Sequence, residues 1–319
     1  MDALLIMLKN VIIFVLLALP GYVLVKGKIL KTEQAGALSK VLTYVGMPFL
    51  ILSSTLKLSL SGELMKTLLL VATLGVAFTM AIFFLSKPLT KGEKDEKTRG
   101  MERFCATFSN NGFLGLPLAI VVFGADAKAV TVVVVLNIIT NILMFTLGIY
   151  LVSGDKQAIS LKKAFLSPVL IAFVIGILLN ALKVAEHIPE ITTYSAHFSN
   201  IVTPISMTIL GMKTADVKFY NLFASWKTYY VSLLKLIVFP MGAVEVLLLI
   251  RMFASGLVDS DLILGTFMAF AVPTAGLAST FSEQFDGDSE SAVTFTLGTT
   301  ILSILTLPLL YWLLKFLTL

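Results

Sequence analysis

Two amide side chains stand side by side inside an apolar stretch of the sequence, in the run NNGFLGLP. They belong to Asn110 and Asn111, and Gly112, Gly115 and Pro117 follow them. Amides can donate hydrogen bonds to a carboxylate, glycine lets a backbone approach a ligand closely, and proline interrupts a helix. This combination favours a binding site for a small anion at a broken helix. The alternative is a helix that is merely kinked by its proline.

A matching interruption occurs in the second half of the chain, in the run AVPTAG. Pro273 and Gly276 supply the break, and Thr274 and Ala275 lie between them, with the threonine hydroxyl as the polar group. The N-terminus of a helix carries partial positive charge and unpaired N–H groups, which suit an anion. Two broken helices whose N-termini meet inside a membrane therefore predict an anion site.

A polar stripe follows each interruption. Asn137 and Asn141 are four residues apart, so they share one face of a helix. For these two asparagines the sequence favours a role in lining a cavity. A second stripe, of hydroxyl residues near the C-terminus, fits a cavity and ordinary hydrogen bonding between helices equally well. Its members are Thr296, Thr299, Thr300 and Ser303.

Lys235 lies well inside the apolar segment 228–253, and Glu245 lies one to three turns from its outer end. Ionisable residues at membrane depth are functional hypotheses by default, so both are candidate coupling groups. Three interpretations of Lys235 stay open. Its ammonium group pairs with an acid, attracts an anion, or extends to the cytoplasmic interface along its flexible side chain.

Several kinds of site are not favoured by the sequence. No Asp or Glu lies within either interruption, which disfavours a sodium site built from acidic side chains. The single Cys105 and two histidines form no metal-ligand pattern, and no nucleophile is paired with an acid–base group at membrane depth. We therefore expect no metal, no cofactor and no enzymatic activity.

The composition predicts an all-α polytopic membrane protein. The 319 residues are 57% hydrophobic and only 13% charged, with a mean hydropathy of +0.96, whereas soluble domains carry about 25% charged residues. The net charge of +5 does not indicate a nucleic-acid partner, because basic residues of membrane proteins gather in cytoplasmic loops. Apolar runs of about 20 residues predict ten transmembrane helices. Their ranges are 4–25, 35–56, 64–86, 102–123, 127–152, 164–182, 195–212, 228–253, 261–285 and 291–316.

Basic residues set the predicted orientation. The loops that follow the first, third, fifth and seventh predicted helices carry 15 basic residues, against seven on the other side. The excess of Lys and Arg marks cytoplasmic loops, so both termini are expected outside.

The prolines indicate an internal repeat. Pro48 and Pro204 are 156 residues apart, and so are Pro117 and Pro273. We expect a first five-helix repeat over 1–153 and a second over 164–319. Because five is an odd number, the second repeat must be inserted upside down, which is the inverted-repeat arrangement of many secondary transporters.

Three runs, NNGFLGLPLA, PISMTILGM and AVPTAGLAS, resemble the auxin efflux carrier family, and the resemblance covers essentially the whole chain. The chain is similar to bacterial members such as malate and malonate permeases, and is related to the plant PIN-FORMED carriers. The resemblance implies a fold similar to bile-acid/sodium symporters and sodium/proton antiporters, with broken crossover helices four and nine. It also implies a scaffold of helices 1, 2, 6 and 7, and a transport domain of helices 3–5 and 8–10 that moves like an elevator. Plant members often carry a long loop between helices five and six, but here that loop spans only 153–163, so phospho-regulation there is not expected.

Residues and resemblance together predict a secondary transporter that moves a small organic anion, a mono- or dicarboxylate, across a bacterial cytoplasmic membrane. The alternative is an anion channel or a membrane-embedded solute sensor. The expected partners are the anion, the lipid bilayer and a second copy of the chain, which would form a homodimer through the scaffold helices. The predicted substrate-binding residues are Asn110, Asn111, Gly112, Gly115, Thr274, Ala275, Asn137 and Asn141, and the predicted crossover breaks lie at Pro117, Pro273 and Gly276.

Overall fold

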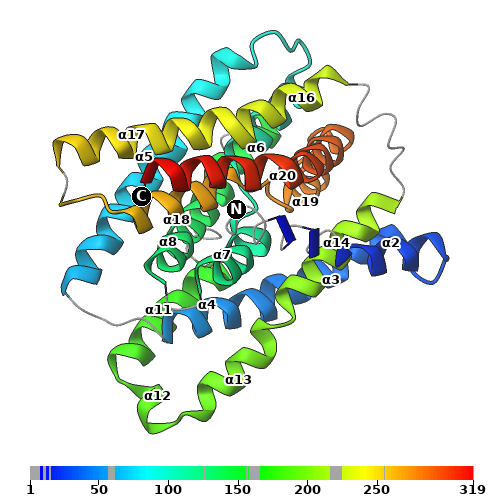
Figure 1. Cartoon of the computed structure of the whole chain (residues 1–319). Helices are drawn as coiled ribbons and strands as arrows, with labels where there is room; N and C mark the ends of the chain where they lie inside the picture. Colours follow the sequence, from blue (N-terminus) through cyan, green and yellow to red (C-terminus); the bar gives the residue numbers. More distant parts are fainter. Residues whose placement is uncertain are drawn as a thin grey trace.

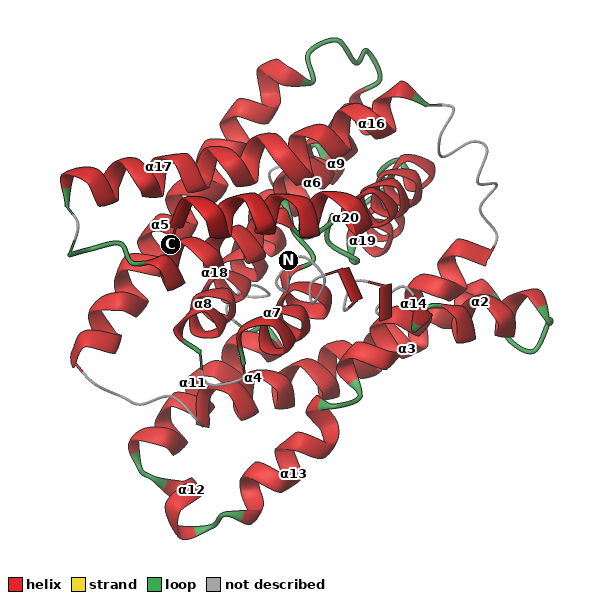
Figure 2. Ribbon diagram, viewed as in Figure 1, coloured by secondary structure: helices red, strands yellow, loops and turns green. Residues whose placement is uncertain are grey.

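The computed structural model of the chain is an assembly of helices (Figures 1 and 2). It describes residues 8–9, 12–13, 16–56, 62–124, 127–155, 157, 166–215, 225–254 and 256–318, without the side chains of 62–65 and 317–318. The beginnings of the predicted first and sixth spans lie outside these ranges, as do the basic loop residues Lys156, Lys162, Lys163 and Lys218. Within the described ranges the regular structure is helical, apart from one isolated β-bridge.

The helices of the first half are α2 (Leu19–Lys26), η1 (Thr32–Gln34), α3 (Ala35–Val41), η2 (Leu42–Gly46), α4 (Met47–Leu56), α5 (Gly62–Leu89), α6 (Glu96–Thr107), η3 (Asn111–Gly115), α7 (Leu116–Phe123), α8 (Lys128–Leu143), η4 (Met144–Gly148) and α9 (Ile149–Ser153). Those of the second half are α11 (Pro168–Ala181), α12 (Val184–His187), α13 (Glu190–Ser199), α14 (Val202–Ala215), α16 (Trp226–Leu233), η6 (Leu234–Val238), α17 (Phe239–Phe253), α18 (Ser260–Ala271), α19 (Ala278–Gln284) and α20 (Ser289–Thr318).

Five helical runs of the described chain are long and apolar enough to cross a membrane. These runs are Thr32–Leu56, Lys66–Leu89, Lys128–Ser153, Trp226–Phe253 and Ser289–Phe316, and they fall on five of the ten predicted spans. Shorter apolar helices fall on three further predicted spans, at Asn111–Phe123, Pro168–Ala181 and Ser260–Ala271. The chain is therefore a multi-helical membrane protein.

The predicted seventh span differs from the structure at both ends. The prediction was one helix over 195–212, but α13 ends at Ser199 and α14 begins at Val202 and continues to Ala215. Pro204 explains the new start, because it lies in the first turn of α14. A proline is tolerated there, since the N–H group it lacks would have no acceptor within the helix.

Three π-turns precede three of the helix prolines. The turns η2, η3 and η6 each end two residues before a proline, namely Pro48, Pro117 and Pro240. In an α-helix a proline ring clashes with the carbonyl group four residues earlier and leaves it without a donor. Here that carbonyl belongs to the middle residue of the π-turn in each case, and the wider turn accommodates the ring. The helices therefore continue through these prolines.

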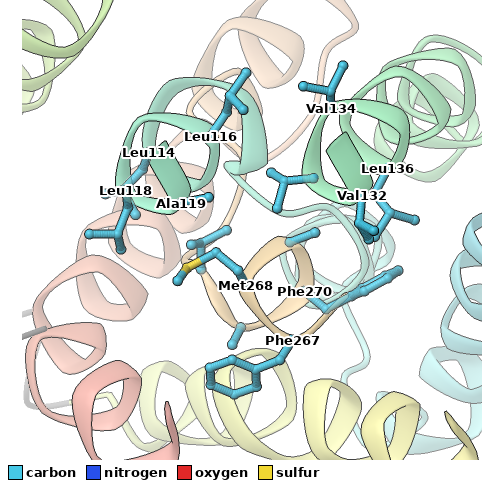
Figure 3. Packing of buried hydrophobic residues seen from close by; sticks show 14 of the residues in the cluster. Leu114, Leu116, Leu118, Ala119, Val132, Val134, Leu136, Phe267, Met268 and Phe270 are labelled. Carbon is cyan, nitrogen blue, oxygen red and sulfur yellow. The ribbon is translucent and has the colours of Figure 1, made fainter. Parts of the chain in front are cut away.

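The helices pack in two groups. The first group contains α2, α3, α4, α11, α13 and α14 and lies in the lower part of Figure 1, whereas the second contains α5 to α9 and α16 to α20. Within the second group, α18 packs against α8 and against α17. Figure 3 shows Phe267, Met268 and Phe270 of α18 among apolar side chains of α7 and α8, including Leu116 and Val134. This core surrounds the interrupted helices described next.

Candidate functional site

Two helical runs are interrupted, and the interruptions pair with each other. Helix α6 ends at Thr107 and helix resumes at Asn111, whereas α18 ends at Ala271 and α19 begins at Ala278. An antiparallel β-bridge joins Ser109 to Thr274. Around this bridge the Asn110 N–H donates to the Pro273 carbonyl at 2.7 Å, and the Ala275 N–H donates to the Phe108 carbonyl at 2.9 Å. Backbone groups that leave a helix in a dry interior need such partners, so the pairing stabilises both breaks.

The position of the first break differs from the prediction. The sequence placed it at Pro117. In the structure the backbone is already extended at Phe108, and helical structure begins again at Asn111. Pro117 lies in the first turn of α7, which directly follows the π-turn η3. Because η3 accommodates this proline, the helix runs through it. Pro273 does lie in the extended segment of the second break, and Gly276 lies between that segment and α19.

Lys235 reaches the paired breaks from a third helical run. Its side chain is buried, with 1% of the residue exposed. Its Nζ donates to Ser109 Oγ at 2.5 Å and to the Phe270 carbonyl at 2.8 Å. The ammonium group forms no ion pair with a carboxylate of the described residues. Lys235 therefore neither pairs with a described acid nor extends out of the protein, and its Nζ is held by Ser109 and by the end of α18.

A cavity of about 590 Å³ adjoins the breaks, and we call it the amide cavity. Ser109, which accepts the hydrogen bond from Lys235, is one of its lining residues. None of the described residues that line it carries a charged side chain. Seven predicted site residues line it: Asn110, Asn111, Gly112, Asn137, Asn141, Ala275 and Gly276. Its apolar wall includes Met47, Phe113, Met144 and Phe145.

The asparagines of the amide cavity differ in what their amides bind. Asn111 Nδ2 donates to Thr140 Oγ1 at 3.0 Å, and Asn141 Nδ2 donates to Asn137 Oδ1 at 3.0 Å. Asn137 is 1% exposed, and its own Nδ2 has no hydrogen-bond partner among the described residues. The side-chain amide of Asn110 likewise makes no hydrogen bond in the described structure. An unpaired buried donor costs about 1–3 kcal/mol, so Asn137 favours a ligand that supplies an acceptor.

Gly112 allows this arrangement by its lack of a side chain. A Cβ atom there would lie 2.7 Å from Met47 Cε and 2.9 Å from Asn137 Oδ1, which is closer than atoms tolerate. The glycine therefore lets the first turn of η3 approach α8 and the amide of Asn137. Gly115 does not line the amide cavity, and its place is against Val272 of the second break.

Thr274 does not take the ligand role that the sequence suggested. It is fully buried, it does not line the amide cavity, and its Oγ1 donates to the Cys105 carbonyl at 2.8 Å. Its backbone N–H donates to Thr299 Oγ1 at 3.2 Å. The hydroxyl is therefore used to bind the last turn of α6, and we assign Thr274 to the support of the breaks. Thr299, a member of the predicted hydroxyl stripe, therefore accepts a hydrogen bond within the protein.

Glu245 stands apart from the site, because it is exposed on α17 and lines neither this cavity nor the smaller one beside it. That smaller cavity, of about 50 Å³, shares Asn110, Phe113, Gly276 and Leu277 with the amide cavity. Lys213 of α14 lines it and donates from Nζ to Ser279 Oγ of α19.

Sequence reasoning missed three residues of this site. Lys213 was counted only as a basic loop residue, and Ser109 and Thr140 were noted beside the selected residues without being predicted as site residues. Ser109 directly precedes the two amides, and Thr140 lies between Asn137 and Asn141 in the sequence. Their proximity in sequence to the selected asparagines could have indicated that Ser109 and Thr140 belong to the site.

Comparison with known proteins gives two kinds of match. A family model described as membrane transport protein matches the chain twice, over residues 5–161 and 155–311. A protein of Methanothermobacter thermautotrophicus, named an uncharacterized transporter, is 27% identical over 306 residues, which are 94% of this chain and 96% of that protein. Another uncharacterized transporter, from Methanocaldococcus jannaschii, is 27% identical over 311 residues, or 95% and 97% of the two chains.

Proposed function

The chain belongs to the membrane transport protein family, as its resemblance to the auxin efflux carriers implies, and from that premise we propose that it carries a small organic anion. The substrate is a mono- or dicarboxylate, and the chain acts as a secondary transporter of the cytoplasmic membrane. As a transport protein of this family, it is not an enzyme.

One observation carries the proposal: the amide cavity offers unpaired donors and no carboxylate. Asn137 Nδ2 and the amide of Asn110 have no acceptor among the described residues. The helical run Asn111–Phe123 begins at the cavity wall, where its first N–H groups lack intrahelical acceptors. Behind the wall, Lys235 adds a positive charge through Ser109. A carboxylate satisfies these groups, and a cation would meet no counter-charge.

Each wall of the cavity has a role in this proposal. Asn110 and Asn137 donate to the carboxylate, and the side chain of Asn111 is fixed by its hydrogen bond to Thr140. The organic part of the substrate lies against the apolar wall formed by Met47, Phe113 and Met144. Such a division between a few polar donors and an apolar remainder is usual for small-molecule sites.

The two packing groups support a mechanism of alternating access. The paired breaks, Lys235 and α8 all lie in the second group, which therefore holds the donors of the amide cavity. The groups touch through α14 with η3, and through α8 with α4 and α11. We propose that the second group moves like an elevator against the first, which corresponds to the scaffold expected from the resemblance. The second group then comprises crossover helices that move with the substrate.

The experiment is counterflow in liposomes that contain the purified protein. Labelled malonate, succinate and lactate outside are tested against the same unlabelled acid inside. We expect saturable exchange, and Asn137→Ala and Asn110→Ala should each lower it about tenfold or more, because a hydrogen bond to a charged ligand is worth about 1.5–3 kcal/mol.

Asn200→Ala is the matched control, since this asparagine is exposed at the end of α13. Wild-type exchange rates in both amide variants would remove these residues from the mechanism. Flux that follows voltage, does not saturate and is not stimulated by acid on the opposite side would indicate a channel. Binding without any flux would indicate a solute sensor.

A further inference from the structure

A second polar space lies beside the amide cavity, and we call it the lysine cavity. This is the cavity of about 50 Å³ that shares Asn110, Phe113, Gly276 and Leu277 with its larger neighbour. Besides Lys213, five hydroxyl side chains line it: Ser39, Ser206, Ser279, Thr296 and Thr300. A space of this size admits a few water molecules or a carboxylate group.

The ammonium group of Lys213 has unused capacity. It can donate three hydrogen bonds, and the described structure shows one, to Ser279 Oγ. It forms no ion pair with a described carboxylate, and Glu283, the acid whose charge acts on it, is exposed farther along α19. A half-buried positive charge without a counter-ion is costly, and an anionic group in the cavity would compensate it.

Two further groups of the lysine cavity lack partners. The buried Oγ1 of Thr296 has none among the described residues. The amide of Asn110 lies at the boundary of the two cavities and is equally unpaired. Lys213 comes from the first packing group, whereas Ser279 and Thr296 come from the second. An anion bound here would therefore contact both groups at once.

We propose that the substrate is a dicarboxylate that binds at two points, with Lys213 as the residue that selects the second charge. One carboxylate accepts hydrogen bonds from Asn137 and Asn110 in the amide cavity. The other lies in the lysine cavity against Lys213 and the Thr296 hydroxyl. This inference rests on the proposed function and narrows its substrate class, because a monocarboxylate would leave one of the two sets of donors unsatisfied.

The test compares succinate with butyrate, which has the same four carbons and lacks the second carboxylate. Labelled succinate and labelled butyrate are exchanged in liposomes that contain wild-type protein, Lys213→Met or Lys213→Arg. We expect wild-type KM to be about tenfold or more lower for succinate. Lys213→Met should raise the succinate KM to near the butyrate value, whereas Lys213→Arg should keep most of the preference.

Lys183→Met is the control, since Lys183 is an exposed lysine at the start of α12. Equal KM values for both acids in the wild type, or an equal loss of both in Lys213→Met, would overturn the inference while the carrier function stands. If neither these two acids nor malonate and lactate are exchanged, the proposed function falls and this inference falls with it. If Lys213→Met does not fold, the wild-type KM ratio and Lys213→Arg decide the question.

Discussion

Lys235 contributes a buried amino group to the paired breaks, although it does not line the amide cavity. The Phe270 carbonyl that it binds belongs to the last turn of α18, where carbonyl groups have no donor within the helix. The amino group thus supplies a donor at the carbonyl end of one half-helix and binds Ser109 of the other break.

We therefore expect Lys235→Met to lower carboxylate exchange about tenfold or more, because it removes the charge and leaves a buried carbonyl unpaired. Lys235→Arg should retain part of the activity, since it keeps the charge. Counterflow measures both, and size-exclusion chromatography verifies the fold. Full activity of Lys235→Met would show that its charge does not serve the substrate.

The sequence predicted most of the polar wall at this scale. Seven of the eleven residues assigned to binding or to the breaks line the amide cavity. It could not predict the roles of Thr274 and Lys213, because these depend on how each helix is rotated about its axis. Thr274 turns toward Cys105, whereas Lys213 turns toward Ser279, and neither partner is near in sequence.

The interrupted elements depend on each other through few contacts. Thr274 binds the end of α6 through its side chain and binds α20 through its backbone N–H. Both bonds are buried, so their loss is not replaced by water.

Replacement of Thr274 by valine preserves its shape and removes the hydroxyl group. We expect Thr274→Val to lower the free energy of unfolding by about 1–3 kcal/mol, because the Cys105 carbonyl is left unpaired. Thermal unfolding in detergent measures this. The control is Thr73→Val, at an exposed threonine of α5 that bonds a carbonyl of its own helix. An equal midpoint in both variants would contradict a supporting role of Thr274.

Proline positions gave an incomplete guide to the elements. The sequence correctly marked Pro117 as a perturbed position, but it placed the break there instead of at 108–110. Single residues do not reveal whether a helix will break or widen at a proline. That choice depends on neighbours, and the break at 108–110 has its partners in Pro273 and Ala275 of the second repeat.

At the scale of the whole molecule, the membrane character and the two repeats were predictable from composition and from the spacing of prolines. The family model matches the chain twice, in agreement with two repeats. The division into scaffold and transport domains and the orientation of the termini stay predictions. The contact between α14 of the first packing group and η3 of the second can be used to test the motion.

A disulfide across the two groups should stop transport. Ser206 Oγ of α14 donates to the Phe113 carbonyl of η3 at 3.3 Å, so the two backbones are close. We expect the double variant Ser206→Cys and Phe113→Cys, in a Cys105→Ala background, to lose most exchange on oxidation and regain it on reduction, because an elevator motion must separate these helices. Each single cysteine variant is the control. Undiminished exchange by the oxidised protein would exclude movement at this contact.

The bridge between Ser109 and Thr274 joins residues that lie on different copies of the repeat. Neither copy alone holds a complete set of partners for its exposed backbone, and neither holds the whole binding wall. A single copy of the repeat would therefore need a second copy beside it before the backbone of its broken helix found these partners.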